Sequence, residues 1–155
     1  MDISKNIDYP ESEFERQLSA NFGHAVRVLT SSSRRTETLQ PLGIDLWPAV
    51  RLNQIGFLYN SKGSPVAFAT WAFVTDEVAQ SMLADPNYRM DIGEWNEGDQ
   101  LWLVDFVAPF GGEARNLVRK LCAVYLPGAW RVRGIRRYAT PGKASRVVDF
   151  KRKAV

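Results

Sequence analysis

The chain has one cysteine and one histidine among its 155 residues, and both scarcities exclude classes of protein. A single cysteine, Cys122, cannot form an internal disulfide, which is typical of a protein from a reducing cytoplasm. With only His24 and Cys122 available, a zinc or other soft-metal site cannot be assembled in the usual way. We therefore expect no metal and no permanently bound cofactor. A Ser-His-Asp or Cys-His catalytic site would have to use His24.

Long apolar runs are also missing from the chain. No run reaches 18 residues, so we expect no membrane-spanning helix. The first residues lack a basic segment followed by an apolar stretch, so we expect no secretory signal and a cytoplasmic location. With 45% hydrophobic residues, the chain can bury a substantial core. We predict a flexible arm over residues 1–10 and one domain over residues 11–155.

Acidic residues are scarce in the last quarter of the chain. Residues 115–155 hold 12 of the 20 basic residues but one of the 17 acidic ones, Asp149. This quarter is therefore predicted to attract anions. Part of its charge alternates with apolar residues, as in an edge strand that resists aggregation or a docking face for an acidic partner. Those residues are Arg131, Arg133, Arg136 and Arg137.

The pattern of apolar residues predicts helices and strands in alternation. Ser12, placed three residues before Glu15, predicts the start of a helix that ends near residue 30. Further helices are predicted over 39–52, 75–84 and 113–125, and strands over 55–59, 66–73, 101–107, 130–135 and 147–150. Residues 87–100 are predicted to form a surface loop. This order indicates an α/β (α+β) domain whose mixed, mostly antiparallel central sheet is flanked by helices.

The helix over 113–125 carries a predicted core stripe. It consists of Ala114, Leu117, Val118, Leu121 and Val124, with Cys122 as a small core filler.

Asp105 stands alone in a strand that is otherwise apolar. Its neighbours from Trp102 to Val107 are typical of a strand buried on both faces, and Gly111-Gly112 then opens a turn. Burying a carboxylate costs several kcal/mol unless it is partnered or protonated. Two interpretations stay open. Asp105 takes a backbone or arginine partner that orders a loop, or it takes part in catalysis or ligand orientation.

Three segments together resemble the RTX toxin-activating lysine acyltransferases, over roughly residues 20–150. They are Trp102-x-x-Asp105-x-x-Ala108-Pro109-Phe110-Gly111, Leu46-Trp47-Pro48-Ala49-Val50-x-x-Asn53-Gln54 and Pro65-Val66-Ala67-Phe68-Ala69-Thr70-Trp71-Ala72. The resemblance implies a GNAT-like fold and the transfer of a fatty acyl group from acyl carrier protein to a lysine of a protoxin. It favours acyl carrier protein as the partner of the arginine-rich stretch, and a homodimer is left open.

The resemblance also implies that Asp105 works with a histidine at the end of the first helix, in a Ser-x-x-His-Arg context. Here the segment reads Ser32-Ser33-Arg34-Arg35-Thr36. Alignment from Gly23 puts Arg35 at the histidine position, and alignment back from Pro48 puts Arg34 there. An arginine cannot act as a base, but it can bind an anion or simply suit a solvated helix end.

Three functions remain open at this point. The leading one is lysine acyl transfer from acyl carrier protein to a protein substrate, with Asp105 as base or orienter. The second is a catalytically reduced relative that binds acyl carrier protein or acyl chains without transfer. The third is a small basic nucleic-acid-binding domain, although no recognised motif accompanies the charge. His24 is a weak candidate base, because it lies about 16 Å along a helix from Arg35.

Overall fold

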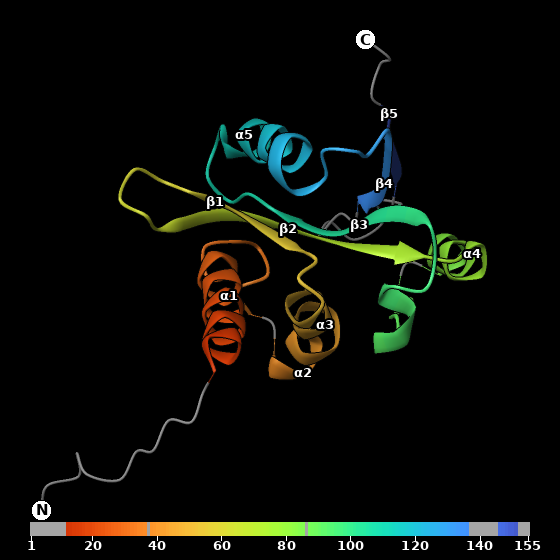
Figure 1. Cartoon of the computed structure of the whole chain (residues 1–155), viewed down its shortest axis with the longest axis horizontal. Helices are drawn as coiled ribbons and strands as arrows, with labels where there is room; N and C mark the ends of the chain where they lie inside the picture. Colours follow the sequence, from red (N-terminus) through yellow and green to blue (C-terminus); the bar gives the residue numbers. More distant parts are fainter. Residues whose placement is uncertain (1–11, 37, 86, 137–145, 152–155) are drawn as a thin grey trace, which may run out of the picture.

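The computed structural model describes residues 12–36, 38–85, 87–136 and 146–151, and Figure 1 shows a sheet with helices on both sides. The predicted arm over residues 1–10 lies outside the described residues. Short π-helical turns (η2, η4) and a 3-10 turn (η3) extend or link the regular elements. In chain order the elements are α1 (Glu13–Leu29), α2 (Leu39–Pro41), η2 (Leu42–Leu46), α3 (Trp47–Arg51), β1 (Ile55–Tyr59), β2 (Pro65–Val74), α4 (Asp76–Ala84), η3 (Ile92–Trp95), β3 (Gln100–Val107), α5 (Glu113–Lys120), η4 (Leu121–Tyr125), β4 (Arg131–Arg136) and β5 (Arg146–Lys151).

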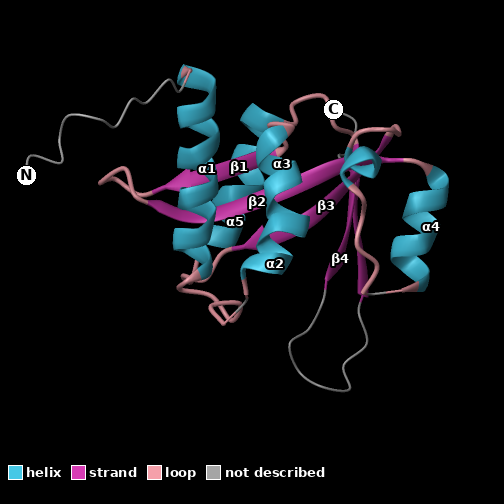
Figure 2. Cartoon of the chain, turned by 90° about the horizontal axis from the view of Figure 1, so that it is seen from below, coloured by secondary structure: helices cyan, strands magenta, loops and turns pink. Residues whose placement is uncertain are grey.

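The five strands lie in chain order, β1-β2-β3-β4-β5. Neighbouring strands are antiparallel except β3 and β4, whose parallel step requires the crossover that α5 and η4 provide. β3 and β4 pair only at Trp102–Arg133 and Leu103–Gly134, and Figure 2 shows β4 running at a steep angle to β3. The predicted α/β class, with a mixed and mostly antiparallel sheet flanked by helices, is confirmed.

Different helices cover the two faces of the sheet (Figure 1). We call the face covered by α1, α2 and α3 the α1 face, and the face covered by α5 and η4 the α5 face. On the α1 face, Val28 and Leu46 pack with Phe68 in one buried cluster, and a second cluster surrounds Trp102. On the α5 face, Leu117 packs in a third cluster with Ala67, Ala69, Trp71, Leu101 and Leu121. The central strands are therefore buried on both faces, and each face has its own core, whereas β5 is mostly exposed.

Most predicted elements are confirmed. Ser12 Oγ accepts the N–H of Glu15 at 3.2 Å and begins α1. Thr75 caps α4 in the same way, accepting the N–H of Val78 at 3.3 Å. The loop prediction for residues 87–100 was wrong in one respect, because η3 lies there and buries Trp95. The edge-strand interpretation of residues 131–136 was also wrong, because β5 pairs outside β4.

The predicted core stripe of the helix over 113–125 was only partly right. Leu117 and Leu121 are buried, but Val118 is 42% exposed and Val124 is 61% exposed. Cys122, expected in the core, is exposed as well. A single line of the helix meets the sheet, and the π-helical turn η4 shifts the phase of the residues after Lys120. The helix therefore leaves apolar side chains on its outer side.

Candidate active site

A β-bulge in β3 determines which face of the sheet Asp105 occupies. Asp105 pairs with Thr70 but Leu103 pairs with Trp71, so Val104 is an extra residue in β3. Before the bulge, Leu101 and Leu103 face the α5 cluster. Strict alternation would have sent Asp105 the same way. The extra residue instead places Asp105 on the α1 face, in phase with Thr70.

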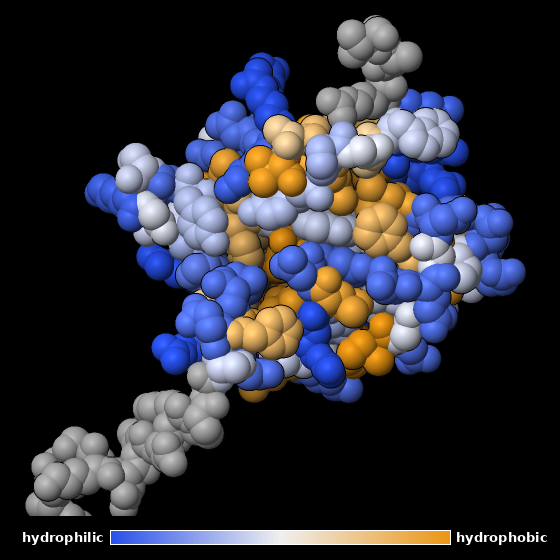
Figure 3. Space-filling view, viewed as in Figure 1, coloured by the Kyte–Doolittle hydropathy of each residue, from blue (hydrophilic) through white to orange (hydrophobic). Residues whose placement is uncertain are grey.

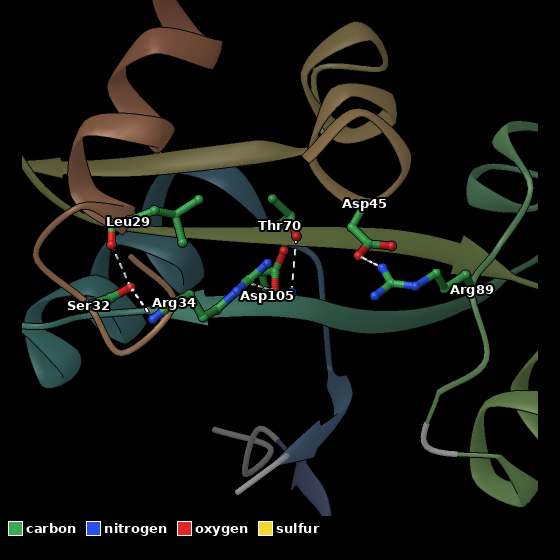
Figure 4. Close-up of polar contacts among 7 residues, drawn as sticks. All are labelled: Leu29, Ser32, Arg34, Asp45, Thr70, Arg89 and Asp105. Carbon is green, nitrogen blue, oxygen red and sulfur yellow. Dashed lines mark hydrogen bonds and ion pairs between the residues drawn. The ribbon is translucent and has the colours of Figure 1, made fainter. Parts of the chain in front are cut away.

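Thr70 holds the backbone of Asp105 at this bulge. Its Oγ1 atom accepts the Asp105 N–H at 3.0 Å, and its side chain is fully buried. A bulge disrupts the regular ladder, and here a hydroxyl serves as acceptor for a strand N–H. Figure 4 shows Thr70 and Asp105 side by side on β2 and β3. The carboxylate therefore extends from a fixed position.

Arg34 forms an ion pair with Asp105. Its Nη1 lies 2.5 Å from Asp105 Oδ1, and the two side chains are 27% and 12% exposed, respectively. The turn after α1 presents this arginine, because Ser32 Oγ donates to the Leu29 carbonyl at 2.8 Å and accepts the Arg34 N–H at 3.1 Å. Figure 4 shows Arg34 reaching along the sheet toward the carboxylate. A charged hydrogen bond of this kind satisfies a carboxylate that is largely withdrawn from water.

Of the two arginines that the sequence proposed for this position, the structure brings Arg34 to Asp105. Arg35 is exposed, and its backbone N–H donates to the Ser32 carbonyl at 3.3 Å. The alignment back from Pro48 therefore agrees with the geometry, and the alignment from Gly23 does not. The arginine partner agrees with the first interpretation of Asp105, and its role in catalysis or ligand orientation stays a prediction.

A second ion pair on the α1 face was missed by sequence reasoning. Arg89 Nη1 bonds to Asp45 Oδ2 and so links η2 to the segment after α4. Figure 4 shows this pair on the same side of β2 and β3 as Thr70 and Asp105. Asp45 is the only charged residue between Leu42 and Val50. That isolation among apolar residues is the signal that singled out Asp105, and it could have identified Asp45 too.

The arginines predicted to form a docking face are engaged with their own chain. Arg131 bonds to Asp149 through two nitrogens, with Nη2 at 2.7 Å from Oδ2 and Nε at 3.0 Å from Oδ1. The hydrogen bond from Arg131 lowers the pKa of Asp149. Arg133 bonds to Gln100 Oε1 and lies 4.8 Å from the centre of the Trp102 ring. Arg136 ends β4, and Arg137 lies outside the described residues.

His24 lies apart from Asp105. It projects from α1 toward β1, where its Nδ1 is 3.3 Å from Tyr59 Oη and its ring meets Phe57 edge to face. β2 separates β1 from β3, so His24 and Asp105 stand over different strands. The contacts of His24 fit a packing role at the edge of the sheet.

A cavity among the described residues does not coincide with the Arg34–Asp105 pair. It has a volume of about 530 Å³ and opens where β3 and β4 begin. Its walls include Leu101, Leu126 and Trp130, with Arg131 and Arg133 at its side. Within the described ranges, no three His, Cys, Asp or Glu side chains gather to hold a metal ion. None of the described helices is long and apolar enough to cross a bilayer.

Comparison with known proteins identifies the family. Residues 15–151 match the family model described as HlyC, the RTX toxin acyltransferase family. The chain belongs to this family. Its members are acyltransferases, and a GNAT-like fold is consistent with this assignment.

Individual relatives carry names that agree with the family. The chain is 30% identical over 123 residues to the leukotoxin-activating lysine-acyltransferase LktC of Mannheimia haemolytica serotype A1, covering 79% of this chain and 71% of that protein. It is 33% identical over 81 residues to the lysine-acyltransferase RtxC of Vibrio cholerae, covering 52% of each. It is 38% identical over 64 residues to the RTX-II toxin-activating lysine-acyltransferase ApxIIC of Actinobacillus pleuropneumoniae, covering 41% of this chain and 39% of that protein.

Proposed function

We propose that this chain transfers a fatty acyl group from acyl carrier protein to a lysine side chain of a protein substrate. In this proposal Asp105 and Arg34 stand at the reacting centre. The observation that carries it is their ion pair at 2.5 Å, on a carboxylate that a bulge and Thr70 turn toward the α1 face. Family membership supports acyl transfer as the reaction class.

The reaction requires a neutral amine. A lysine with a pKa near 10.4 is almost wholly protonated at neutral pH, so a base must accept its proton. The lysine Nζ attacks the thioester carbonyl carbon, a C–N bond forms and the C–S bond breaks. The ammonium first releases one proton to solvent, which gives the neutral amine. Asp105 then accepts a second proton from the attacking nitrogen and returns it to the sulfur, which leaves as a thiol. A thioester and an amine thus become an amide and a thiol.

Arg34 contributes a fixed positive charge and exchanges no proton. A guanidinium remains protonated throughout the working range of pH. Its bond to Asp105 holds the carboxylate in one position. The same charge would stabilise the carbonyl oxygen as it becomes negative in the tetrahedral intermediate. Asp105 is the proposed base, and Arg34 its partner and an electrostatic stabiliser.

The test is Asp105→Asn, with Asp149→Asn as the matched control. Both aspartates bond to an arginine, but Asp149 is exposed and lies on β5. Acyl transfer from acyl carrier protein to a lysine-bearing peptide should fall about 100-fold or more in Asp105→Asn, in line with general-base contributions. It should be unchanged in Asp149→Asn. Wild-type transfer by a folded Asp105→Asn variant would overturn the proposal.

A second function is favoured by one specific observation, the arginine that pairs with Asp105 where the family resemblance implies a histidine. A chain that lost its strongest base could still bind acyl carrier protein or an acyl chain without transferring the acyl group. Such a chain would bind acylated carrier protein and leave the lysine peptide unmodified. Multiple-turnover mass spectrometry of the peptide distinguishes this binding-only function from transfer.

A further inference from the structure

Helix α5 presents two arginines on its outer side. Arg115 and Arg119 are exposed, while Leu117 between them is fully buried against the sheet. Each residue of a helix turns about 100° around the helix axis, so each arginine is rotated about 200° from Leu117. Both arginines therefore lie on the side of α5 that faces away from the sheet. Figure 3 shows strongly hydrophilic side chains beside hydrophobic ones over the α5 region.

Arg115 does not serve the helix itself, whereas Arg119 lies in the last turn of α5, where a cation suits the helix dipole. Like charges four residues apart repel each other, and a cation in the first turn opposes the helix dipole, as Arg115 does. Neither guanidinium forms an ion pair with any described residue, and Asp149, the one acid of residues 115–155, is held by Arg131. Lys120 differs from both, because its Nζ lies 5.3 Å from the centre of the Tyr59 ring. Both guanidinium groups are therefore available, as far as the described residues go, to a partner of opposite charge.

Exposed apolar side chains accompany the two arginines on α5 and η4. Val118 is 42% exposed and Val124 is 61% exposed, although sequence periodicity placed both in the core. We call Arg115, Val118, Arg119, Cys122 and Val124 together the α5 surface. A surface that mixes exposed apolar side chains with cations that have no acidic neighbour among the described residues fits a protein partner that has carboxylates around apolar residues. Nucleic acid would instead favour a denser run of cations.

We propose that the α5 surface is where acyl carrier protein docks, an inference that rests on the proposed function. Carboxylates of the carrier would meet Arg115 and Arg119, and its apolar side chains would meet Val118 and Val124. α5 begins shortly after β3 ends, so Arg115 in its first turn is near the end of β3 in the chain, although α5 covers the face of the sheet opposite Asp105. The acyl group of a docked carrier would therefore have to reach the reacting centre around the end of β3. The β4 arginines are less available, because Arg131 and Arg133 must first leave Asp149 and Gln100.

The experiment compares Arg115→Glu with Arg16→Glu in the full chain. Arg16 is an exposed arginine near the start of α1, on the opposite face of the sheet, so both variants make the same change of charge. Affinity for acylated carrier protein, measured by titration at fixed salt, should fall about tenfold or more in Arg115→Glu and stay at the wild-type value in Arg16→Glu. The melting temperature should not fall in Arg115→Glu, because a glutamate at this position would suit the helix start and pair with Arg119.

A small acyl thioester without the carrier protein separates docking from chemistry. Arg115→Glu should transfer from an acyl-N-acetylcysteamine at the wild-type rate and from acyl carrier protein with a raised KM. Wild-type affinity for the carrier in Arg115→Glu, or an equal loss of that affinity in Arg16→Glu, would contradict docking on the α5 surface. A loss of carrier affinity seen only in an Arg131→Ser/Arg133→Ser double variant would place the docking site on β4. It would also contradict docking on the α5 surface.

The outcomes also separate this inference from the proposed function. If the wild type transfers from the small thioester but does not bind carrier protein, then carrier protein is not the acyl donor and the α5 surface is not its docking site. The proposed role of Asp105 would still stand. If Arg115 is instead needed for binding a DNA or RNA oligonucleotide and not the carrier, the α5 surface is overturned in favour of a nucleic-acid interface. If Asp105→Asn transfers like the wild type while Arg115→Glu loses carrier affinity, the chemistry fails and the docking surface stands.

Discussion

The Arg34–Asp105 and Arg131–Asp149 pairs join the same two kinds of side chain in different surroundings. Asp105 is 12% exposed and meets an arginine 71 positions away in the sequence. Asp149 is 33% exposed and meets an arginine 18 positions away, on the adjoining strand. Arg131 donates hydrogen bonds to both carboxylate oxygens of Asp149. The Arg34–Asp105 pair, in contrast, depends on the bulge in β3, on buried Thr70 and on the hydrogen-bonded turn after α1.

This difference is the basis for proposing that the Arg34–Asp105 pair is functional and the Arg131–Asp149 pair structural. Exposed pairs on adjacent strands form easily and contribute little to stability. The Asp105 pair withdraws a carboxylate from water and uses several elements to aim it, which strand pairing alone does not need. Arrangements of this kind concentrate at functional sites. The predictions below are designed to break or sharpen this contrast, and they run from the largest expected effect to the smallest.

Removing the charge of Arg34 should have the largest effect of these. In Arg34→Gln, Asp105 keeps its position but loses the cation beside it, so transfer should fall by about 10- to 100-fold. Unfolding should become easier by about 1.5–3 kcal/mol, since a charged hydrogen bond is lost at a largely buried carboxylate. Arg34→Lys should recover part of both losses. Steady-state transfer and urea denaturation of the two variants measure this, and equal transfer by Arg34→Gln and wild type would remove Arg34 from the site.

Thr70→Val should have the next largest effect. Valine matches threonine in shape but cannot accept the Asp105 N–H, so Asp105 should lose its fixed position and kcat should fall about tenfold with KM unchanged. Thr70→Ser keeps the hydroxyl and should restore kcat. A purely structural role would lower the melting temperature of Thr70→Val without this difference in kcat, and that pattern would contradict positioning.

The Arg131–Asp149 pair should give a small effect that depends on pH. The pKa of Asp149 is lowered from 3.8 by the Arg131 hydrogen bond, so the folded state holds the carboxylate ionised more strongly than the unfolded state does. The stabilisation is therefore complete above pH 3.8 and lost as pH falls through the lowered value. The melting temperatures of wild type and Asp149→Asn should differ slightly at pH 7 and converge in acid. A large loss of acyl transfer in Asp149→Asn would contradict the proposal that, of the two pairs, Arg34–Asp105 alone serves the reaction.

The smallest effect on stability should come from the Tyr88–Glu94 bond, in which a neutral donor binds a carboxylate. Tyr88 donates to Glu94 Oε1 at 2.7 Å, and this bond, followed by burial, raises the pKa of Tyr88 to about 12. The folded state therefore keeps this proton longer, and the added stability, present below the ordinary value of 10.0, disappears as pH rises toward about 12. Ultraviolet titration of the wild type should show a tyrosine that ionises near pH 12, and Tyr88→Phe should lack it. A wild type whose tyrosines all ionise near pH 10 would contradict the bond.

The sequence predicted the parts of this molecule that depend on local patterns. Ser12 and Thr75 mark helix starts through neighbours three residues away, and Asp105 stands out because its neighbours are apolar. The bulge at Val104 was not predictable, since it depends on the register between two strands. Arg34 and Arg35 could not be separated until the turn after α1 was seen. Val118 and Val124 look like core residues in the sequence, and only the way α5 meets the sheet leaves them exposed.

The pH dependence of acyl transfer by wild type, Arg34→His and Arg35→His tests the central claim most directly. If Arg34 holds Asp105 and exchanges no proton, the wild-type logarithmic rate should rise evenly from about pH 5.5 to about 8 as the acceptor lysine loses its proton. Arg34→His should add a break near the ordinary histidine pKa of about 6.5, and Arg35→His should follow the wild type. A break near that pH in the wild type, or identical profiles for the two histidine variants, would contradict the account.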